Sequence, residues 1–263
     1  MSALSPAEAA RALYPAAVAA VAAVAQPPAP PAAPVLVFCD VDETLIDCKS
    51  LFDFLDFYLS AKYGGEGTRQ AERTRRDLAA MTAAGVPREE ANRAYYRIWA
   101  GESAVEVVRA GVAWWGARSA DPDFLIASTL RELDRHRAAG AAIVLVSGSF
   151  PAVLEPIAAY VGAERLLCSR PELSAGRFTG RLEGAPMIGE AKRAAVRALL
   201  HAAPAVDPAR CFAYGDHISD LPMLSEVGHP VVVGGDPDLL AALAHGRALA
   251  GRGESGLPGM SDS

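Results

Sequence analysis

Two acidic side chains, Asp40 and Asp42, directly follow an apolar segment at residues 35–39 and have the spacing for acid–base or metal chemistry. A buried strand that ends in two carboxylates is costly unless a cation or a substrate neutralises them, because desolvation disfavours the charged form. The pair therefore indicates a functional site at the end of this segment.

Other polar groups stand in comparable places. Ser147 and Gly148 end a second apolar segment, which puts a hydroxyl beside a backbone that can approach an anion closely. Asp216 and Asp220 follow another, and Lys192 lies near the start of a predicted helix. Each has an ordinary explanation alone, as a turn residue, a helix cap or a solvated charge. Their shared placement at strand ends favours one common site.

The elements that must position these groups are short segments that are apolar on both faces, as strands of a covered parallel sheet are. They are Val35–Cys39, Ala142–Val146, Leu166–Cys168, Cys211–Tyr214 and Pro230–Val233. Segments with helical spacing lie between or after them: Pro151–Val161, Glu190–His201 and Asp238–Ala250. This alternation predicts a doubly wound α/β fold. In a strand order of 3-2-1-4-5, the polar ends of strands one, two and four are neighbours.

Residues 50–121 interrupt the alternation and contain no buried-strand segment. Four helical stretches are predicted there: Leu51–Leu59, Arg69–Ala83, Arg88–Trp99 and Val105–Trp115. An all-helical insertion at the carboxyl end of the first strand would cover the crevice where such sheets bind ligands. Residues 170–184 contain Ser174-Ala175-Gly176 and are predicted to form a hairpin.

Composition excludes several classes of protein. The 263 residues carry 25 basic and 31 acidic side chains, a net charge of -6, which argues against a nucleic-acid partner or an anionic membrane surface. No run of about 20 strongly apolar residues predicts a membrane span. The four cysteines form no C-x-x-C pair. These features predict a reduced, cytoplasmic protein.

The two ends differ from the rest in composition. Residues 1–34 are rich in Ala and Pro and are predicted to form an arm or linker; the alternative is a secretory signal ending at Ala23-Val24-Ala25. Residues 251–263 are predicted to be disordered. The predicted core domain then comprises residues 35–49 and 122–250, with residues 50–121 as the helical cap.

The polar segments, in this order, resemble the four motifs of the haloacid dehalogenase superfamily, and specifically its phosphoserine-phosphatase-like subfamily IB. The motifs are D-V-D-E-T from Asp40, then Ser147, Lys192, and G-D-H-I-S-D from Gly215. Similarity also covers Asn92–Gly101, Gly189–Lys192 and Tyr214–Leu224. The resemblance spans about residues 35–240. It implies a Rossmann-like, doubly wound sheet of order 3-2-1-4-5 with an inserted helical cap.

The resemblance also implies a Mg²⁺-dependent phosphatase that forms an aspartyl phosphate. Asp40 would be the nucleophile, and Asp42 would protonate the leaving group and then activate water. The metal would be held by Asp40, Asp216 and the backbone carbonyl of Asp42, helped by Asp220. The phosphoryl oxygens would be held by Ser147, Gly148 and Lys192, with Thr44 hydrogen-bonded near the nucleophile. Glu43 and His217 are interpreted as local packing or surface residues.

Two positions depart from the phosphoserine phosphatases. Lys49 stands where those enzymes have a Glu that binds the substrate's amino group, and Ser219 where Asn is common. Lys49 would repel an ammonium group and select an anion, or it points to solvent beside the cap. The expected substrate is a small phosphorylated metabolite, acidic or neutral, with phosphoserine disfavoured.

The cap carries arginines and aromatic residues that admit two interpretations. The arginines either form a solvated helix face or point inward to bind a second anionic group. The aromatic residues suit cap packing, and one or two could line a pocket. The arginines are Arg69, Arg73, Arg75, Arg76, Arg93 and Arg97, and the aromatic residues are Tyr95, Tyr96, Trp99, Trp114 and Trp115.

Two alternatives to a phosphatase stay open. A phosphotransferase or mutase would use the same aspartyl phosphate with another acceptor, and an inactive binding module would keep only the fold. The intact set of Asp40, Asp42, Lys192 and Asp216 favours an enzyme, because unused buried charges are costly. The sequence does not indicate an oligomeric state.

Overall fold

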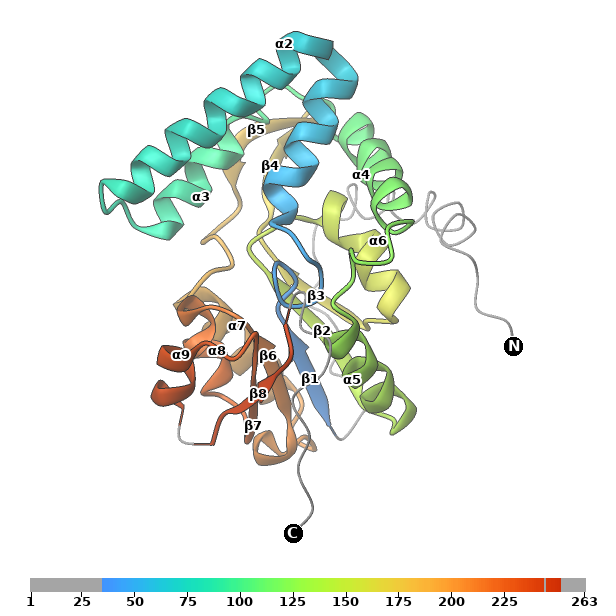
Figure 1. Cartoon of the computed structure of the whole chain (residues 1–263), viewed down its shortest axis with the longest axis vertical. Coiled ribbons are helices and arrows are strands. Elements are labelled where there is room, and N and C mark those ends of the chain that lie inside the picture. Colours follow the sequence, from blue (N-terminus) through green and yellow to red (C-terminus); the bar gives the residue numbers. More distant parts are fainter. Residues whose placement is uncertain (1–34, 244, 252–263) are drawn as a thin grey trace.

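The computed structural model describes residues 35–243 and 245–251. Its centre is a parallel six-stranded sheet of order β3-β2-β1-β6-β7-β8 (Figure 1). The strands are β1 (Leu36–Cys39), β2 (Ala142–Ser147), β3 (Arg165–Cys168), β6 (Phe212–Gly215), β7 (His229–Val233) and β8 (Arg247–Leu249). The five predicted strands are confirmed in the predicted order 3-2-1-4-5, with β8 added at the edge.

The sheet forms from these residues because both of its faces are buried against helices. Val37 and Cys39 of β1 join one apolar cluster, and Leu36 and Phe38 join the other, as the two-residue period of a strand requires. The first cluster includes residues from α5 (Ala127–Ala138) and α6 (Pro151–Val161). The second includes residues from α7 (Glu190–Ala202), α8 (Leu221–Leu224) and α9 (Pro237–Ala242).

The predicted helix over Asp238–Ala250 is wrong in its second half. Helix α9 ends at Ala242, and residues 247–249 form β8, which pairs with β7 at Val232↔Ala248. The edge of β7 offers backbone hydrogen-bonding groups that a strand can satisfy, and this tertiary pairing overrides the local helical spacing.

Above the carboxyl ends of the strands lie α2 (Ser50–Ala83), α3 (Arg88–Arg97) and α4 (Ala104–Arg118), the helical layer (Figure 1). The two helices predicted at 51–59 and 69–83 belong to one long element, interrupted at Gly64, whose φ of 56° departs from helical geometry. The other two predicted helices are confirmed as α3 and α4, with ends shifted by up to three residues.

The predicted hairpin is formed by β4 (Pro171–Ser174) and β5 (Arg177–Leu182). Its two-residue turn places Ala175 and Gly176 at φ of 49° and 74°, the left-handed region that tight hairpin turns use. The hairpin joins the helical layer, because the Gly101 amide donates to the Phe178 carbonyl at 2.8 Å. The layer is thus not purely helical.

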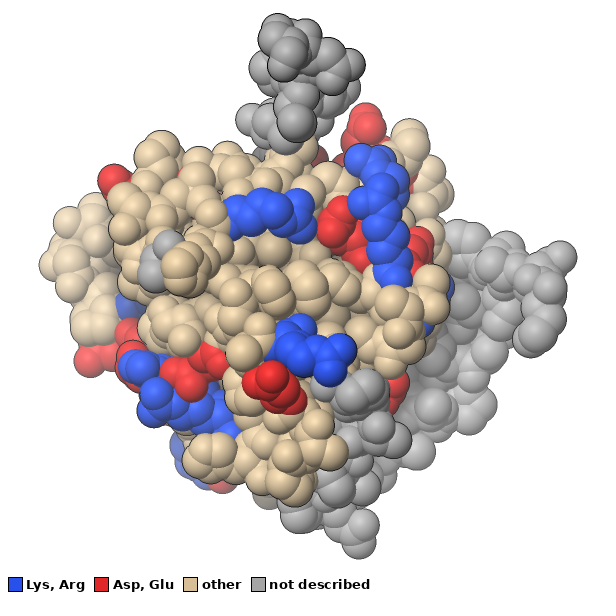
Figure 2. All heavy atoms as spheres, turned by 90° about the horizontal axis from the view of Figure 1, so that it is seen from below, with Lys and Arg blue, Asp and Glu red and all other residues tan. Residues whose placement is uncertain are grey.

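The predicted arm at residues 1–34 and nearly all of the predicted tail, residues 252–263, lie outside the described residues, and the division into core and cap stays a prediction. Within the described ranges, no helix combines the length and the apolar character that a membrane crossing needs. Figure 2 views the molecule from below, and on this face basic and acidic side chains are interspersed in small groups.

Candidate active site

The predicted site residues meet at the carboxyl edge of the sheet, because β2, β1 and β6 are neighbours. Asp40 directly follows β1, and its amide donates to the carbonyl of Tyr214 in β6 at 3.0 Å. Ser147 is the last residue of β2, and Asp216 directly follows β6. The topology alone therefore brings these three side chains to one place.

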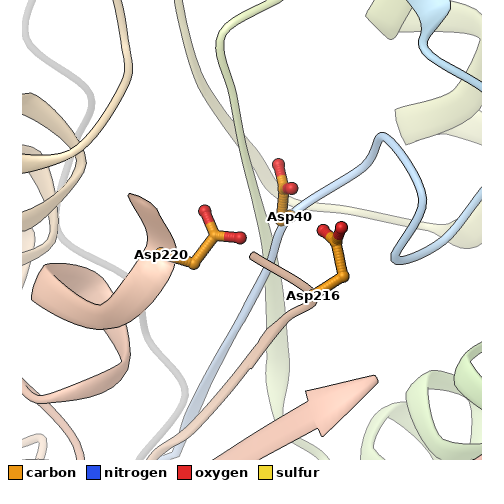
Figure 3. Close-up of side chains that lie close together, drawn as sticks. All are labelled: Asp40, Asp216 and Asp220. Atoms are coloured by element: carbon orange, nitrogen blue, oxygen red, sulfur yellow. The ribbon is translucent and has the colours of Figure 1, made fainter. Parts of the chain in front are cut away.

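Three carboxylates converge there. Asp40, Asp216 and Asp220 each place an oxygen within 4.8 Å of the others, and Figure 3 shows the three side chains grouped around one space. Burial raises the pKa of Asp40 well above its usual value, and the nearby Asp220 and Asp216 charges raise it further. Burial and Asp220 raise the pKa of Asp216 to about 6. The Thr44 hydroxyl donates to Asp216 at 2.9 Å.

Lys192 supplies the one positive charge in direct contact with this cluster among the described residues. Its Nζ lies 2.8 Å from Asp40 Oδ1 and 2.7 Å from Asp220 Oδ1, and the side chain is buried. Burial alone would lower its pKa, but Asp220 and Asp40 outweigh burial and raise it. Helix α7 begins two residues earlier, after Gly189 at a φ of 54°, and this turn aims Lys192 at the strand ends.

The three carboxylates fit a divalent cation. Lys192 alone cannot balance three neighbouring carboxylates, and burial, with the neighbouring acidic charges added to it, raises the pKa values of Asp40 and Asp216. Carboxylate oxygens are the ligands that Mg²⁺ prefers. Asp40 and Asp216 would hold the ion, helped by Asp220, which also accepts hydrogen bonds from Lys192 and from the backbone amide of His217.

The Asp42 side chain lies outside the group of three, in keeping with a separate role. Burial raises its pKa to about 6, although the side chain and amide of Ser50 and the charge of Lys192 each lower it. A carboxyl group with this pKa can be protonated or ionised near neutral pH, as a general acid and base must be.

Ser147 and Gly148, at the end of β2, line the same cavity. Ser147 is buried, and its Oγ accepts from the Ser149 amide at 3.1 Å. A Cβ on Gly148 would lie 3.2 Å from Ile188, so a larger residue would crowd this loop. The Gly148 carbonyl accepts from Tyr96 Oη at 2.9 Å and Asn92 Nδ2 at 3.4 Å, which ties α3 to the end of β2.

These groups line a cavity of about 910 Å³. Of the ten predicted site residues, Thr44 alone is absent from its wall and lies behind Asp216. The nine that line it are Asp40, Asp42, Lys49, Ser147, Gly148, Lys192, Asp216, Ser219 and Asp220.

Lys49 is half-exposed and forms an ion pair of 3.2 Å with Glu43, which also lines the cavity. Ser219 hydrogen-bonds His217, whose ring contacts the Arg88 guanidinium at 2.8 Å. Sequence reasoning assigned Glu43 and His217 to surface or packing and did not identify Arg88. Arg88 is the first residue of α3, and its place in the wall depends on the long-range contact with His217, for which the sequence gives no signal.

The six arginines considered on α2 and α3 mostly point outward. Arg69 and Arg73 pair with Glu66 on the surface, and Arg93 donates to the Gly184 carbonyl. Of the predicted six, Arg75 alone lines the cavity, and it is paired with Asp56. The packing interpretation of the five aromatic residues is confirmed, since all are buried; Tyr95 also contributes to the cavity wall.

The sequence matches the family model of haloacid dehalogenase-like hydrolases over residues 37–225, most of the described chain. The chain belongs to this family. The matched region includes every motif residue at the sheet edge.

Three curated relatives are similar to part of this chain. An inhibition of morphological differentiation protein from Streptomyces azureus is 40% identical over 43% of this chain and 41% of its own length. A probable phosphatase of Mycobacterium tuberculosis is 38% identical over 40% of this chain and 36% of its own. A phosphoserine phosphatase of the same organism is 34% identical over 53% and 44%. The matches span less than half the length of these relatives.

Solved structures share the fold of this chain. A protein of unknown function from Bordetella pertussis is 27% identical, with a TM-score of 0.68 over 80% of this chain and 94% of that one. A substrate-bound phosphoserine phosphatase is 16% identical, with a TM-score of 0.60 over 81% and 92%. This second likeness concerns the fold.

Proposed function

We propose that this hydrolase is a Mg²⁺-dependent phosphomonoesterase of subfamily IB that acts on a small phosphorylated metabolite through an aspartyl phosphate. The observation that carries the proposal is the position of Asp40. Its carboxylate lies in the wall of the cavity, beside two further carboxylates and in contact with Lys192. That combination suits attack on phosphorus, because Lys192 and a Mg²⁺ ion held by the carboxylates would together supply positive charge to the phosphoryl oxygens.

In the proposed reaction, Asp40 attacks the phosphoryl group while Asp42 donates a proton to the departing alkoxide oxygen. Asp42 then removes a proton from the water that hydrolyses the aspartyl phosphate, so one carboxyl group serves both steps. Lys192 and the backbone around Ser147 and Gly148 hold the phosphoryl oxygens. When bound, Mg²⁺ would supply positive charge to the nucleophile and the phosphoryl oxygens.

The cavity supports a substrate without an amino group. Among the described residues that line the cavity, Glu43 is the one carboxylate without a proposed catalytic or metal-binding role. Its charge is already neutralised by the ion pair with Lys49. Arg88, which contacts the His217 ring, adds a second positive charge on this side. An ammonium group would meet repulsion there. The four cysteines are free thiols, which is consistent with the proposed cytoplasmic location.

The test is phosphate release from a panel of metabolite phosphates and p-nitrophenyl phosphate, with Mg²⁺ and with EDTA. We expect turnover that needs Mg²⁺ and that falls at least about 10³-fold in Asp40→Asn, as loss of a nucleophile does. Equal turnover in the variant would contradict the assignment of Asp40. A trapped phosphoenzyme without phosphate release would instead support the transferase alternative.

A further inference from the structure

The part of the cavity that would receive the leaving group is built from two helical stripes. On α2, Leu78, Ala79 and Ala83 recur at helical spacing, and on α3, Ala91 and Tyr95 do the same. Figure 1 shows α2 and α3 running side by side above the strand ends, and both stripes line the same cavity. We name this region the leaving-group cleft and include Leu51 at its base.

The polar groups of the leaving-group cleft are already committed elsewhere. The Tyr95 hydroxyl donates to the Leu51 carbonyl at 2.8 Å, so the ring is the part of Tyr95 that remains for a ligand. The hydroxyl of Thr82, which also lines the cavity, donates to the Leu78 carbonyl of its own helix at 3.1 Å. The Arg75 charge is paired with Asp56. Two further polar residues of α3 line the cavity: Arg88 contacts the His217 ring, and Asn92 donates through Nδ2 to the Gly148 carbonyl while its Oδ1 has no partner. The other residues of the two stripes are aliphatic or aromatic.

The size of the cavity points in the same direction. About 910 Å³ is near the upper end of the range of roughly 300–1,000 Å³ for sites that bury a drug-sized ligand. The alanines at positions 79, 83 and 91 keep the cleft open where larger side chains would close it. A phosphorylated amino acid would leave most of this apolar surface wet.

We infer that the substrate is a phosphomonoester of an extended apolar alcohol, whose hydrocarbon part lies in the leaving-group cleft while its phosphoryl group lies at Asp40. This inference rests on the proposed function for its orientation, because Asp40 fixes the phosphoryl end. Burial of each methylene against the stripes would contribute about three- to fourfold in affinity.

The test measures binding of n-alkylphosphonates, from propyl to octyl, by calorimetry in the presence of Mg²⁺. These phosphonates cannot be hydrolysed at their C–P bond by this reaction, so the readout does not depend on turnover. We expect Kd to fall about three- to fourfold per methylene until the cleft is filled. Inorganic phosphate should compete with every phosphonate, which excludes adsorption of the alkyl chain elsewhere. A Kd that does not change with chain length would overturn the inference.

Two adjacent alanines of α2 provide a matched pair of variants. Both are exposed helix residues, but Ala79 lines the cavity and Ala80 does not. Ala79→Asn should weaken octylphosphonate binding at least about fivefold, because it places an amide against the chain, and should leave propylphosphonate unchanged. Ala80→Asn should change neither. Equal effects of the two variants would refute the placement of the chain along this stripe.

The inference and the proposed function can fail separately. If p-nitrophenyl phosphate gives no Mg²⁺-dependent turnover but Kd still falls with chain length, the cleft binds apolar phosphonates and the proposed hydrolysis is wrong. If turnover is present and lost in Asp40→Asn while Kd is independent of chain length, the phosphatase stands and the apolar substrate class is wrong.

Discussion

Replacing Asp216 by asparagine removes one charge from the cluster of three carboxylates. This substitution should stabilise the metal-free protein and abolish catalysis. In the fold, burial and the Asp220 charge raise the pKa of Asp216 from 3.8 to about 6. Such a shift corresponds to roughly 3 kcal/mol of stability lost when the group ionises. Asp216 retains some solvent exposure, and screening reduces the figure, so we expect Asp216→Asn to gain about 1–2 kcal/mol. The amide oxygen of Asn can still accept the Thr44 hydrogen bond.

The sign follows from linkage. A carboxyl group whose folded pKa lies above its unfolded pKa favours folding below the unfolded value and loses that contribution as the pH rises through the folded value. For Asp216 the window is therefore about pH 4 to 6. The difference in unfolding free energy between Asp216→Asn and the natural protein should be small at pH 4, grow through this window, and be complete by pH 7.

The assay is urea unfolding in EDTA at several pH values, with Asp77→Asn as the control for an exposed carboxylate. The control should change stability by less than about 0.5 kcal/mol at every pH. Mg²⁺ should stabilise the natural protein and have less effect on Asp216→Asn, because a ligand that binds only the folded state raises its stability. A variant less stable than the natural protein at pH 8 in EDTA would refute the electrostatic reasoning.

Two further predictions concern other charges. Burial raises the pKa of Glu155 on α6 to about 7, and the charge of Arg170 opposes this shift. Glu155→Gln should therefore raise the free energy of unfolding by about 1–3 kcal/mol above pH 7 and by little at pH 4. The same urea unfolding measures both values. A gain that is the same at both pH values would contradict this. Lys49→Glu would place a second carboxylate beside Glu43 at the cavity wall. This variant should raise the ratio of kcat/KM for phosphoethanolamine to kcat/KM for ethyl phosphate about fivefold or more. An unchanged ratio would show that Lys49 does not select the substrate.

The fold could be predicted from the sequence because its strands are apolar on both faces and adjoin helices with distinct spacing. The same patterns located Asp40, Ser147 and Asp216, since each ends or directly follows a central strand. Parallel neighbours bring such ends together whatever the details of packing. Strand β8 could not be predicted in this way, because only the edge of β7 makes residues 247–249 extended.

Arg88 and Asn92 show why the rest of the site could not be predicted. Both lie on α3, and they reach the cavity because Tyr96 and Asn92 hydrogen-bond the Gly148 carbonyl and hold the helix there. In the sequence, Arg88 is one of many arginines in a charged stretch. Of the six arginines for which an inward role is predicted as one alternative, Arg75 alone lines the cavity. Selection among them depends on how a helix sits on the sheet, which local patterns do not encode.

The sequence predicts the residues proposed to perform the reaction, but it does not predict the residues that would select the substrate. Asp40, Lys192 and Asp216 have fixed backbone positions at a rigid sheet edge, and their contacts with one another would be costly to maintain without a cation or a phosphoryl group. The leaving-group cleft is built from alanine and leucine at ordinary helical spacing, a pattern that any packed helix shares. Only the three-dimensional arrangement shows that Ala79, Ala83 and Ala91 face an open cavity and not a neighbouring helix. Under the proposed function, the substrate must therefore be identified from the shape and polarity of this cleft, because the motifs proposed to perform the reaction are indifferent to the alcohol that leaves.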